Sequence, residues 1–192
     1  MSVNLVQFDR VWFTSDPHFG HKSILKYCDR PFNSVEEMDE GLIINWNSKV
    51  QKKDITVIVG DFGFGTPSLR LIEILNRLNG KIYHIQGNHD KSITKKLLKQ
   101  KKVLGSKQIE CFKIPDSTQE SGFGYVSACH YPMLSWPHKG HGAIHVYGHW
   151  HDIDPQYHNS VNVCVDLNNY VPISYDEVKE KAENTRIKHF ID

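Results

Sequence analysis

The sequence predicts a layered α/β fold, folded as a single domain over residues 1–192. Short runs of β-branched or aromatic residues alternate with helical patterns in the first half, and strand patterns dominate the second half. The length suits one domain, since domains average about 150 residues. Hydrophobic residues make up 39% and charged residues 23% of the chain. These ordinary values exclude a disordered or fibrous protein.

Seven segments have the composition and pattern of β-strands. The second of them is hydrophobic throughout, as is typical of a strand covered on both faces of its sheet. In chain order the predicted strands are Val11–Ser15, Ile55–Val59, Lys81–Gln86, Ile109–Ile114, Tyr125–His130, His145–Gly148 and Val161–Val165.

Three segments have the spacing of helices. The first begins at Val35, where Ser34 and Glu37 form the pattern of a capping box. The second begins after the pair Thr66-Pro67, because proline favours the first turn of a helix. The third spans Ser92–Lys102.

The net charge, the hydrophobic runs and the cysteines bear on the cellular location of the protein. Lys and Arg number 23 against 22 Asp and Glu, so the net charge of +1 creates no general attraction to nucleic acid or membranes. No hydrophobic run approaches the roughly 18 residues of a membrane span, and residues 1–10 lack the pattern of a secretory signal. The four cysteines are scattered, which favours free thiols over disulfides or zinc ligands. We therefore expect a cytoplasmic protein without a membrane partner.

Five short segments contain the residue types that bind metal ions, and four of them lie where a predicted strand ends. In an extended chain, residues two apart point to the same side, so Asp16 and His18 can bind one ion. Each segment alone could be a turn or a core histidine, but all five together are not expected by coincidence. The segments are Asp16-Pro17-His18, Gly60-Asp61, Gly87-Asn88-His89-Asp90, His130 and Gly148-His149-Trp150-His151.

This order of segments resembles the calcineurin-like metallophosphoesterase superfamily, whose pattern is DxH, GD, GNH[DE], H and GHxH. The resemblance runs from Asp16 to His151 and implies a four-layer α-β-β-α sandwich with two mixed sheets. It also implies a site for two metal ions, with Asp61 bridging them. One ion would be bound by Asp16, His18, Asp61 and His151, and the other by Asp61, Asn88, His130 and His149.

Imidazole, carboxylate and amide ligands favour two Mn²⁺ ions, with Fe, Zn²⁺ or Ni²⁺ as alternatives. Two such ions can activate a shared water and hold a phosphate group. The sequence therefore predicts direct attack by a metal-bridging hydroxide, without a covalent intermediate. His89 has no metal assigned to it, and both the resemblance and the need for a proton donor make it the general acid. We expect Asp90 to orient or charge the His89 ring.

The residues after Asp61 bear on the substrate. Phosphoprotein phosphatases of the superfamily have an Asp-Arg pair there, whereas this chain has Phe62-Gly63-Phe64-Gly65. The missing arginine favours a small bacterial or phage-type phosphoesterase that acts on a phosphodiester or nucleotide phosphate. Two alternatives stay open: a phosphomonoesterase acting on a small molecule or phosphoprotein, and a non-catalytic scaffold with the same fold. The sequence makes no prediction of the oligomeric state.

Several other histidines have two interpretations. His21 can meet a substrate phosphate, although a surface role at a helix start is favoured. His138 and His141 belong to a segment that can form a loop over the metals, with substrate contact as the less favoured reading. His84 and His145 lie inside strand patterns, which favours structural roles.

Lysines recur at helical spacing in the predicted third helix, at Lys91, Lys95, Lys99 and Lys102. A solvated helix face is the favoured interpretation. The alternative is a local track for a nucleic-acid backbone.

Overall fold

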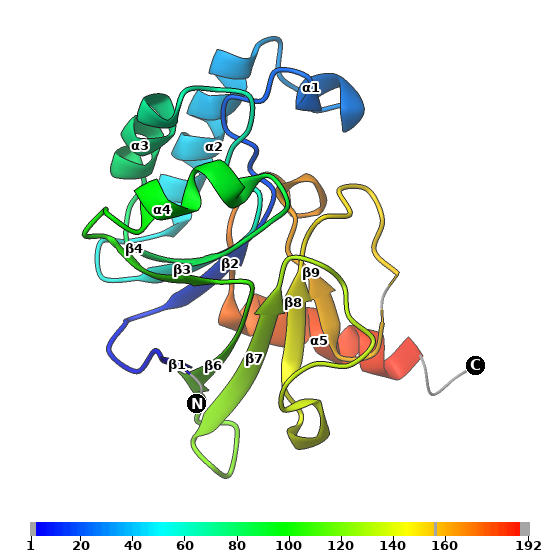
Figure 1. Ribbon diagram of the computed structural model, residues 1–192. Helices are drawn as coiled ribbons and strands as arrows, with labels where there is room; N and C mark the ends of the chain where they lie inside the picture. Colours follow the sequence, from blue (N-terminus) through cyan, green and yellow to red (C-terminus); the bar gives the residue numbers. More distant parts are fainter. Residues whose placement is uncertain (1–2, 156, 189–192) are drawn as a thin grey trace.

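The structure is a computed structural model that describes residues 3–155 and 157–188. Two five-stranded sheets pack face to face (Figure 1). The first sheet has the strand order β10 (Ile173–Ser174), β2 (Val11–Thr14), β3 (Ile55–Val59), β4 (Lys81–Ile85), β5 (Val103–Lys107). The second has the order β1 (Val3–Asn4), β6 (Ile109–Pro115), β7 (Phe123–Cys129), β8 (Ile144–Tyr147), β9 (Ser160–Asn162).

Both sheets are mixed, as predicted. In the first, β2 to β5 are parallel and β10 is antiparallel to β2. In the second, β7 to β9 are parallel, β6 is antiparallel to β7, and β1 is parallel to β6. All seven predicted strands are present, with ends shifted by three residues or fewer. The predicted fold class, two mixed sheets with helices, is therefore confirmed.

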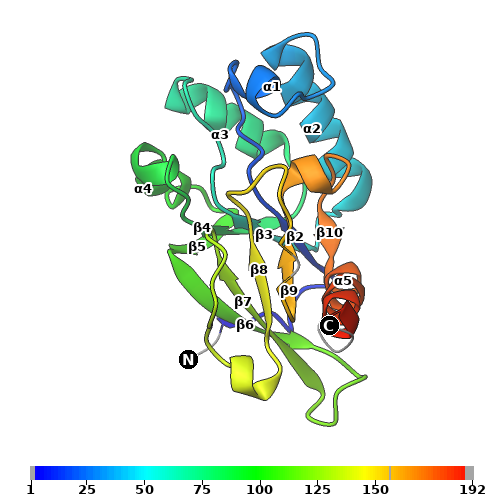
Figure 2. The same ribbon diagram turned by 90° about the vertical axis from the view of Figure 1, so that its right-hand side faces the viewer.

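Four helices lie on the side of the first sheet that faces away from the second (Figure 2). They are α1 (Ile24–Tyr27), α2 (Val35–Lys49), α3 (Ser68–Arg77) and α4 (Thr94–Leu97). The Ser34 side chain accepts a hydrogen bond from the Glu37 backbone N–H at 3.1 Å, so the predicted N-terminal cap of α2 is present. The hydrophobic face of α2, which includes Met38 and Trp46, packs against the outer face of the first sheet.

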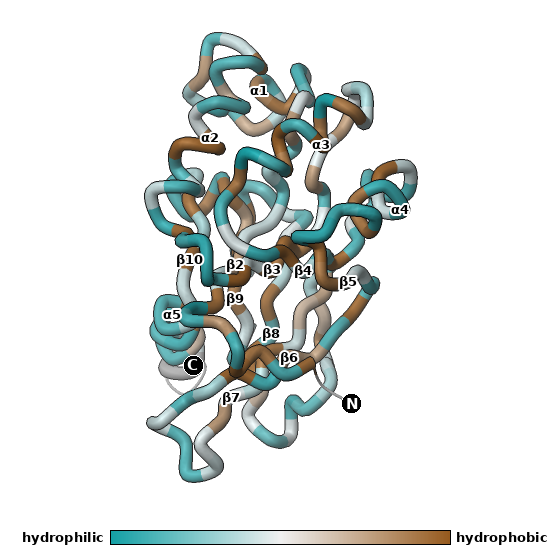
Figure 3. Tube along the Cα trace, turned by 90° about the vertical axis from the view of Figure 1, so that its left-hand side faces the viewer, coloured by the Kyte–Doolittle hydropathy of each residue, from teal (hydrophilic) through white to brown (hydrophobic). Residues whose placement is uncertain are grey.

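The core between the sheets is built from alternate residues of their strands. Phe13 and Val57 from the first sheet meet Phe112, Val126 and Val146 from the second, and all five are fully buried. Figure 3 shows hydrophobic residues concentrated in the strands, whereas α5 (Tyr175–Lys188) is mostly hydrophilic. α5 contacts β9, β10 and β2, so it covers the side of the sandwich formed by the edge strands β9 and β10.

The predicted third helix is wrong in extent. The segment divides into a 3-10 turn at Asp90–Ser92 and the single helical turn of α4, and a strand begins at Val103. The helix ends before Lys102 because Val103 pairs with Ile82 of β4, so the chain must already be extended there. Lys102 donates to the carbonyl oxygens of Leu75 and Leu78, at the end of α3. The lysines therefore do not form one helix face.

The segment with His138 and His141 does not lie over the predicted metal ligands. It precedes the first residue of β8, whereas the ligands follow the last residues of the strands. His138 stacks on Tyr125, with ring centroids 5.1 Å apart. The buried Trp136 stacks in the same way on His145 of β8 at 5.2 Å. The segment thus covers the outer face of the second sheet.

Within residues 3–155 and 157–188, no helix combines the length and the hydrophobicity needed to cross a lipid bilayer. None of the four cysteines, all of which the structure describes, is in a disulfide. Cys28 lies close to His151 and Asp166, as one of three potential ligand groups.

Candidate metal centre

The ends of five strands bring the predicted ligands together. Asp16, Asp61 and Asn88 follow β2, β3 and β4, which are adjacent and parallel, so their carboxyl ends share one edge of the first sheet. His130 and the segment Gly148–His151 follow β7 and β8 of the second sheet in the same way. The sheets join at this edge, where the Ser15 backbone N–H donates to the Val163 carbonyl oxygen at 3.0 Å.

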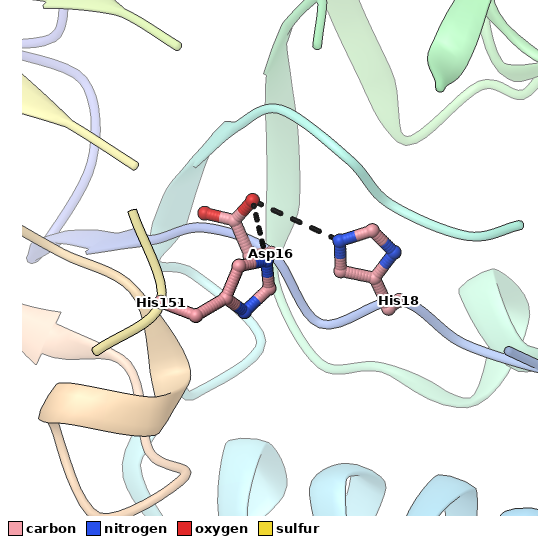
Figure 4. Close-up of side chains that lie close together, drawn as sticks. All are labelled: Asp16, His18 and His151. Carbon is pink, nitrogen blue, oxygen red and sulfur yellow. Dashed lines mark ion pairs between the residues drawn. The ribbon is translucent and has the colours of Figure 1, made fainter. Parts of the chain in front are cut away.

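Asp16, His18 and His151 form the first cluster of ligand atoms (Figure 4). Oδ1 of Asp16 lies 3.9 Å from Nε2 of His18 and 3.7 Å from Nε2 of His151. This oxygen is buried and has no hydrogen-bond partner among the residues that the structure describes. A buried carboxylate oxygen without a partner is costly. A cation between these three atoms would remove that cost.

Asp61 links the first cluster to a second one. Its Oδ2 atom lies 3.6 Å from Nε2 of His18 and 3.5 Å from Nε2 of His130. Nε2 of His130 in turn lies 3.1 Å from Oδ1 of Asn88. Asp61 therefore occupies the position between the two ligand groups that the family resemblance implies for a bridging carboxylate.

His149 joins the second cluster through its ring, whose centroid lies 5.1 Å from that of His130. Its backbone N–H donates to Oδ2 of Asp16 at 2.9 Å. The two predicted ligand sets thus lie side by side. The donor atoms of both sets are imidazole nitrogens and carboxylate or amide oxygens. Such donors suit divalent cations such as Mn²⁺, Fe²⁺ or Zn²⁺.

Four of the predicted ligands have left-handed backbone conformations, which non-glycine residues rarely adopt. The φ angles are 56° at Asp16, 51° at His18, 52° at Asp61 and 70° at His149. The expected extended geometry of the Asp16-Pro17-His18 segment is therefore wrong. The side chains of Asp16 and His18 still converge, but through strained turns of the kind that cluster at functional sites.

Glycines allow the backbone to approach the ligand carboxylates closely. A Cβ atom on Gly87 would clash with the Asp61 carboxylate, and one on Gly148 would clash with the Asp16 carboxylate. The glycine that precedes Asn88 and the one that precedes His149 are therefore required by packing.

Burial and nearby carboxylates shift the pKa values of the histidines in the site. Burial by itself lowers the pKa of His130, but its interaction with Asp61 and the charge of Asp16 outweigh burial and raise that pKa to about 9. For His151 the opposing effect comes mainly from Asp166, and the pKa rises to about 10. Burial raises the pKa of Asp16. Burial and the charge of His151 instead lower the pKa of His18, and burial with the charge of His130 lowers that of His149. The site thus favours positive charge at some of its histidines and opposes it at others.

His89 lies beside both clusters. Its Nε2 atom is 3.9 Å from Oδ2 of Asp61, and its side chain is 33% exposed. The His89 backbone N–H donates to Oδ1 of Asp61 at 2.9 Å, which fixes the start of the side chain. The ring therefore faces a pocket that also exposes His18, Asp61 and Asn88.

Asp90 does not have the contact with His89 that the sequence led us to expect. Its buried carboxylate accepts hydrogen bonds from the backbone N–H groups of Asp61, Phe62 and Gly87, at 2.7, 3.0 and 2.8 Å. It also pairs with Nε2 of His84 at 3.0 Å. Asp90 therefore faces away from its neighbour and holds together the turns that follow β3 and β4.

Asp166 and Arg30 belong to the site but were not predicted. Asp166 accepts a hydrogen bond from Nδ1 of His151 at 2.7 Å, which turns Nε2 of that ring toward Asp16. Arg30 donates to both oxygens of Asp166 at 2.7 and 2.8 Å, and also to the Asp16 carbonyl oxygen. One signal was available, because Asp166 directly follows a predicted strand, as the predicted ligands do.

Comparison with known proteins identifies the family of the chain. The calcineurin-like phosphoesterase family matches residues 9–180. An uncharacterized protein of Methanocaldococcus jannaschii is 34% identical over 187 residues, which cover 93% of this chain and 94% of that protein. The gene 66 protein of Mycobacterium phage L5 is 36% identical over 81 residues, covering 41% of this chain and 39% of its own length.

A solved structure shares the fold. A protein of unknown function from Aquifex aeolicus superimposes with a TM-score of 0.68 at 21% identity, covering 89% of this chain and 98% of that protein. The fold is therefore shared with that protein, and the match over residues 9–180 shows that the chain belongs to the calcineurin-like phosphoesterase family.

Proposed function

We propose that the chain hydrolyses a phosphodiester or a nucleotide phosphate with the help of two divalent metal ions, manganese being the expected metal. The observation that supports this most directly is the convergence of two carboxylates, one amide and four imidazoles at one edge of the sandwich. These groups belong to Asp16, His18, Asp61, Asn88, His130, His149 and His151. Membership in the family supports the reaction class, hydrolysis of a phosphoric ester.

When bound, the ions would supply positive charge to the phosphate group and a nucleophile derived from water. The chain contributes a rigid frame for them. Asp16 is held by the His149 backbone N–H, and Asp61 by the His89 backbone N–H. Ligands fixed in this way need little reorganisation during the reaction.

His89 is the proposed general acid. Its half-buried ring lies in the pocket beside Asp61, where it can donate a proton to the leaving oxygen. Asp90 supports this role indirectly, because its carboxylate holds the turn from which His89 projects.

The pocket suits a singly charged phosphodiester better than a phosphomonoester dianion. None of the described residues that line it is lysine or arginine. Arg30 is buried and paired with Asp166, and Arg70 lies 3.6 Å from Asp39. No lysine or arginine side chain is therefore offered to the extra charge of a monoester.

Kinetics on a matched pair of esters test the proposal. On Mn²⁺-loaded protein we expect kcat/KM for bis(p-nitrophenyl) phosphate to exceed that for p-nitrophenyl phosphate at least tenfold. Removal of the metal with EDTA should abolish both activities. A preference for the monoester would favour a phosphatase. No hydrolysis of either ester, under metal loading verified by elemental analysis, would favour a non-catalytic scaffold.

The variant His89→Ala tests the general acid. We expect roughly 10²–10⁴-fold slower turnover of a diester with an alkyl leaving group, and a much smaller loss for p-nitrophenolate, which leaves without a proton. The bound metal content should not change. His141→Ala is the matched control, because that exposed histidine lies at the other end of β8. Equal losses for both leaving groups would contradict the role of His89.

A further inference from the structure

The pocket over the predicted metal centre is larger than a phosphate group requires. Its volume is about 470 Å³, within the range of pockets that hold whole small molecules. One part of its lining consists of predicted metal ligands, including Asp61 and His149. The remainder comes from α1 and its flanking residues, from the segment after β3, and from His89. With a phosphate bound at the metal centre, this second part would face the organic group that the phosphate esterifies.

Aromatic rings dominate that second part. Phe64 lies edge-on to His21, with ring centroids 4.9 Å apart, and 4.3 Å from the ring of His89. Tyr27 lies edge-on to His21 at 6.3 Å. Tyr27 is 77% and Phe64 42% exposed. Two large aromatic side chains from distant parts of the sequence thus present uncovered surface on one pocket.

The contact between His18 and His21 sets the tautomer of His21. His18 is a predicted metal ligand, and its Nε2 atom faces Asp16 and Asp61. With a cation bound at Nε2, the ring proton of His18 belongs on Nδ1. That atom lies 3.3 Å from Nδ1 of His21, which must then accept the hydrogen bond. His21 therefore carries its proton on Nε2. The ring offers the pocket one N–H donor beside the two aromatic side chains.

The residue types in this lining indicate which organic group of a phosphate ester the pocket can bind. The described residues that line the pocket include no lysine or arginine, so a second phosphate or another anionic group would find no permanently charged partner there. A flat, uncharged ring with hydrogen-bond acceptors matches both the aromatic surface and the N–H group of His21. Nucleobases have these properties, and they stack on aromatic side chains regardless of sequence.

We propose that Tyr27, Phe64 and His21 form a subsite that binds a nucleobase, which makes a nucleotide ester the substrate of the proposed hydrolase. This inference rests on the proposed function, because the subsite is placed relative to a phosphate at the metal centre. The favourable contacts are stacking on Tyr27 or Phe64 and a hydrogen bond from His21.

Binding of two compounds that differ only in the base tests the subsite. Isothermal titration of Mn²⁺-loaded protein compares adenosine 5′-monophosphate with ribose 5-phosphate, and inorganic phosphate reports on the metal centre alone. We expect the nucleotide to bind about tenfold or more tightly than the sugar phosphate, given the usual strength of base–aromatic stacking. If either compound is hydrolysed, the ratio of kcat/KM values takes the place of the affinity ratio.

The double variant Tyr27→Ala with Phe64→Ala should bring the two affinities within about threefold of each other, with phosphate binding unchanged. Ile44→Ala, which removes an exposed hydrophobic side chain on α2, is the matched control. Equal binding of both compounds to the unaltered protein would overturn the subsite, as would a preference that survives in the double variant. A parallel loss of phosphate affinity would overturn it too.

Failure of the proposed hydrolysis has a different signature. In that case the preference for the nucleotide persists, but no ester is turned over.

Discussion

Individual predicted ligands are held by neighbours that the motif pattern does not contain. Asp166 orients the ring of His151 and is itself paired with the buried Arg30. The Asp90 carboxylate fixes the turns at Asp61 and Gly87 by accepting hydrogen bonds from their backbone N–H groups. Such supporting residues fix the orientation and basicity of metal-binding side chains. The precision of the site therefore depends on residues outside the predicted ligand set.

The variant Asp166→Asn should weaken metal binding about 10–100-fold, because His151 loses its charged hydrogen-bond acceptor. It should also lower the free energy of unfolding by up to about 3–5 kcal/mol, since Arg30 keeps a buried charge without its partner. Titration with Mn²⁺ and urea denaturation measure the two effects. Asp9→Asn, at an exposed position, is the control. Unchanged metal affinity in a folded Asp166→Asn protein would show that Asp166 does not position His151.

Among the secondary-structure elements, those with strong local patterns were predicted and those stabilised by distant contacts were not. Ile55–Val59 and the capped helix at Val35 have clear sequence patterns, and both are present. The helix α5 was missed because only a few of its residues, such as Val178 and Ala182, face the core. Its attachment instead depends on Asp116, more than fifty residues earlier in the chain.

Asp116 makes the docking of α5 dependent on pH. It accepts a hydrogen bond from the Tyr175 hydroxyl at 2.9 Å and pairs with Lys179 at 3.2 Å. Burial by itself raises the pKa of Asp116, but bonds from Thr118, Tyr175 and Lys179 outweigh it and lower that pKa below 3.8. The folded state thus holds the ionised form more strongly than the unfolded chain does. The resulting stabilisation is present above about pH 4 and is lost as the pH falls through the lowered pKa.

The variant Asp116→Asn should therefore be less stable than the unaltered protein by about 1.5–3 kcal/mol at pH 7, the usual worth of a charged hydrogen bond. The difference in the free energy of unfolding should shrink below pH 4, where Asp116 of the unaltered protein becomes neutral, as the asparagine of the variant is at every pH. Urea denaturation across pH 2.5–7 measures it, and Asp9→Asn should show no such convergence. A difference that stays constant with pH would mean that the charge of Asp116 does not stabilise the docked helix.

In the whole molecule, the predicted metal centre lies where the two sheets meet. The first sheet supplies Asp16, Asp61 and Asn88, and the second supplies His130 and the segment Gly148–His151. An ion bound between them would cross-link the two halves of the sandwich, and a ligand that binds only the folded state stabilises that state.

Saturation with Mn²⁺ should raise the free energy of unfolding by about 2.7 kcal/mol per site when the free ion is at 100 times its Kd. For a chain of this length each kcal/mol raises the Tm by about 2–4 °C. Differential scanning calorimetry with Mn²⁺ and with EDTA measures the shift. His89→Ala should keep the full shift, and Asp61→Asn should lose most of it. A Tm that Mn²⁺ does not change would contradict the predicted ligands.

The sequence by itself determined seven of the strands, the order of the ligand segments and the family, because each strand and each ligand segment has a recognisable local pattern. Only the tertiary structure decided the partners of these residues. It turned Asp90 away from His89, paired Asp166 with His151, and brought Tyr27 and Phe64 to one pocket. Local patterns specify the backbone of a segment. The direction and partner of a side chain depend on contacts between segments that fold together from distant parts of the chain.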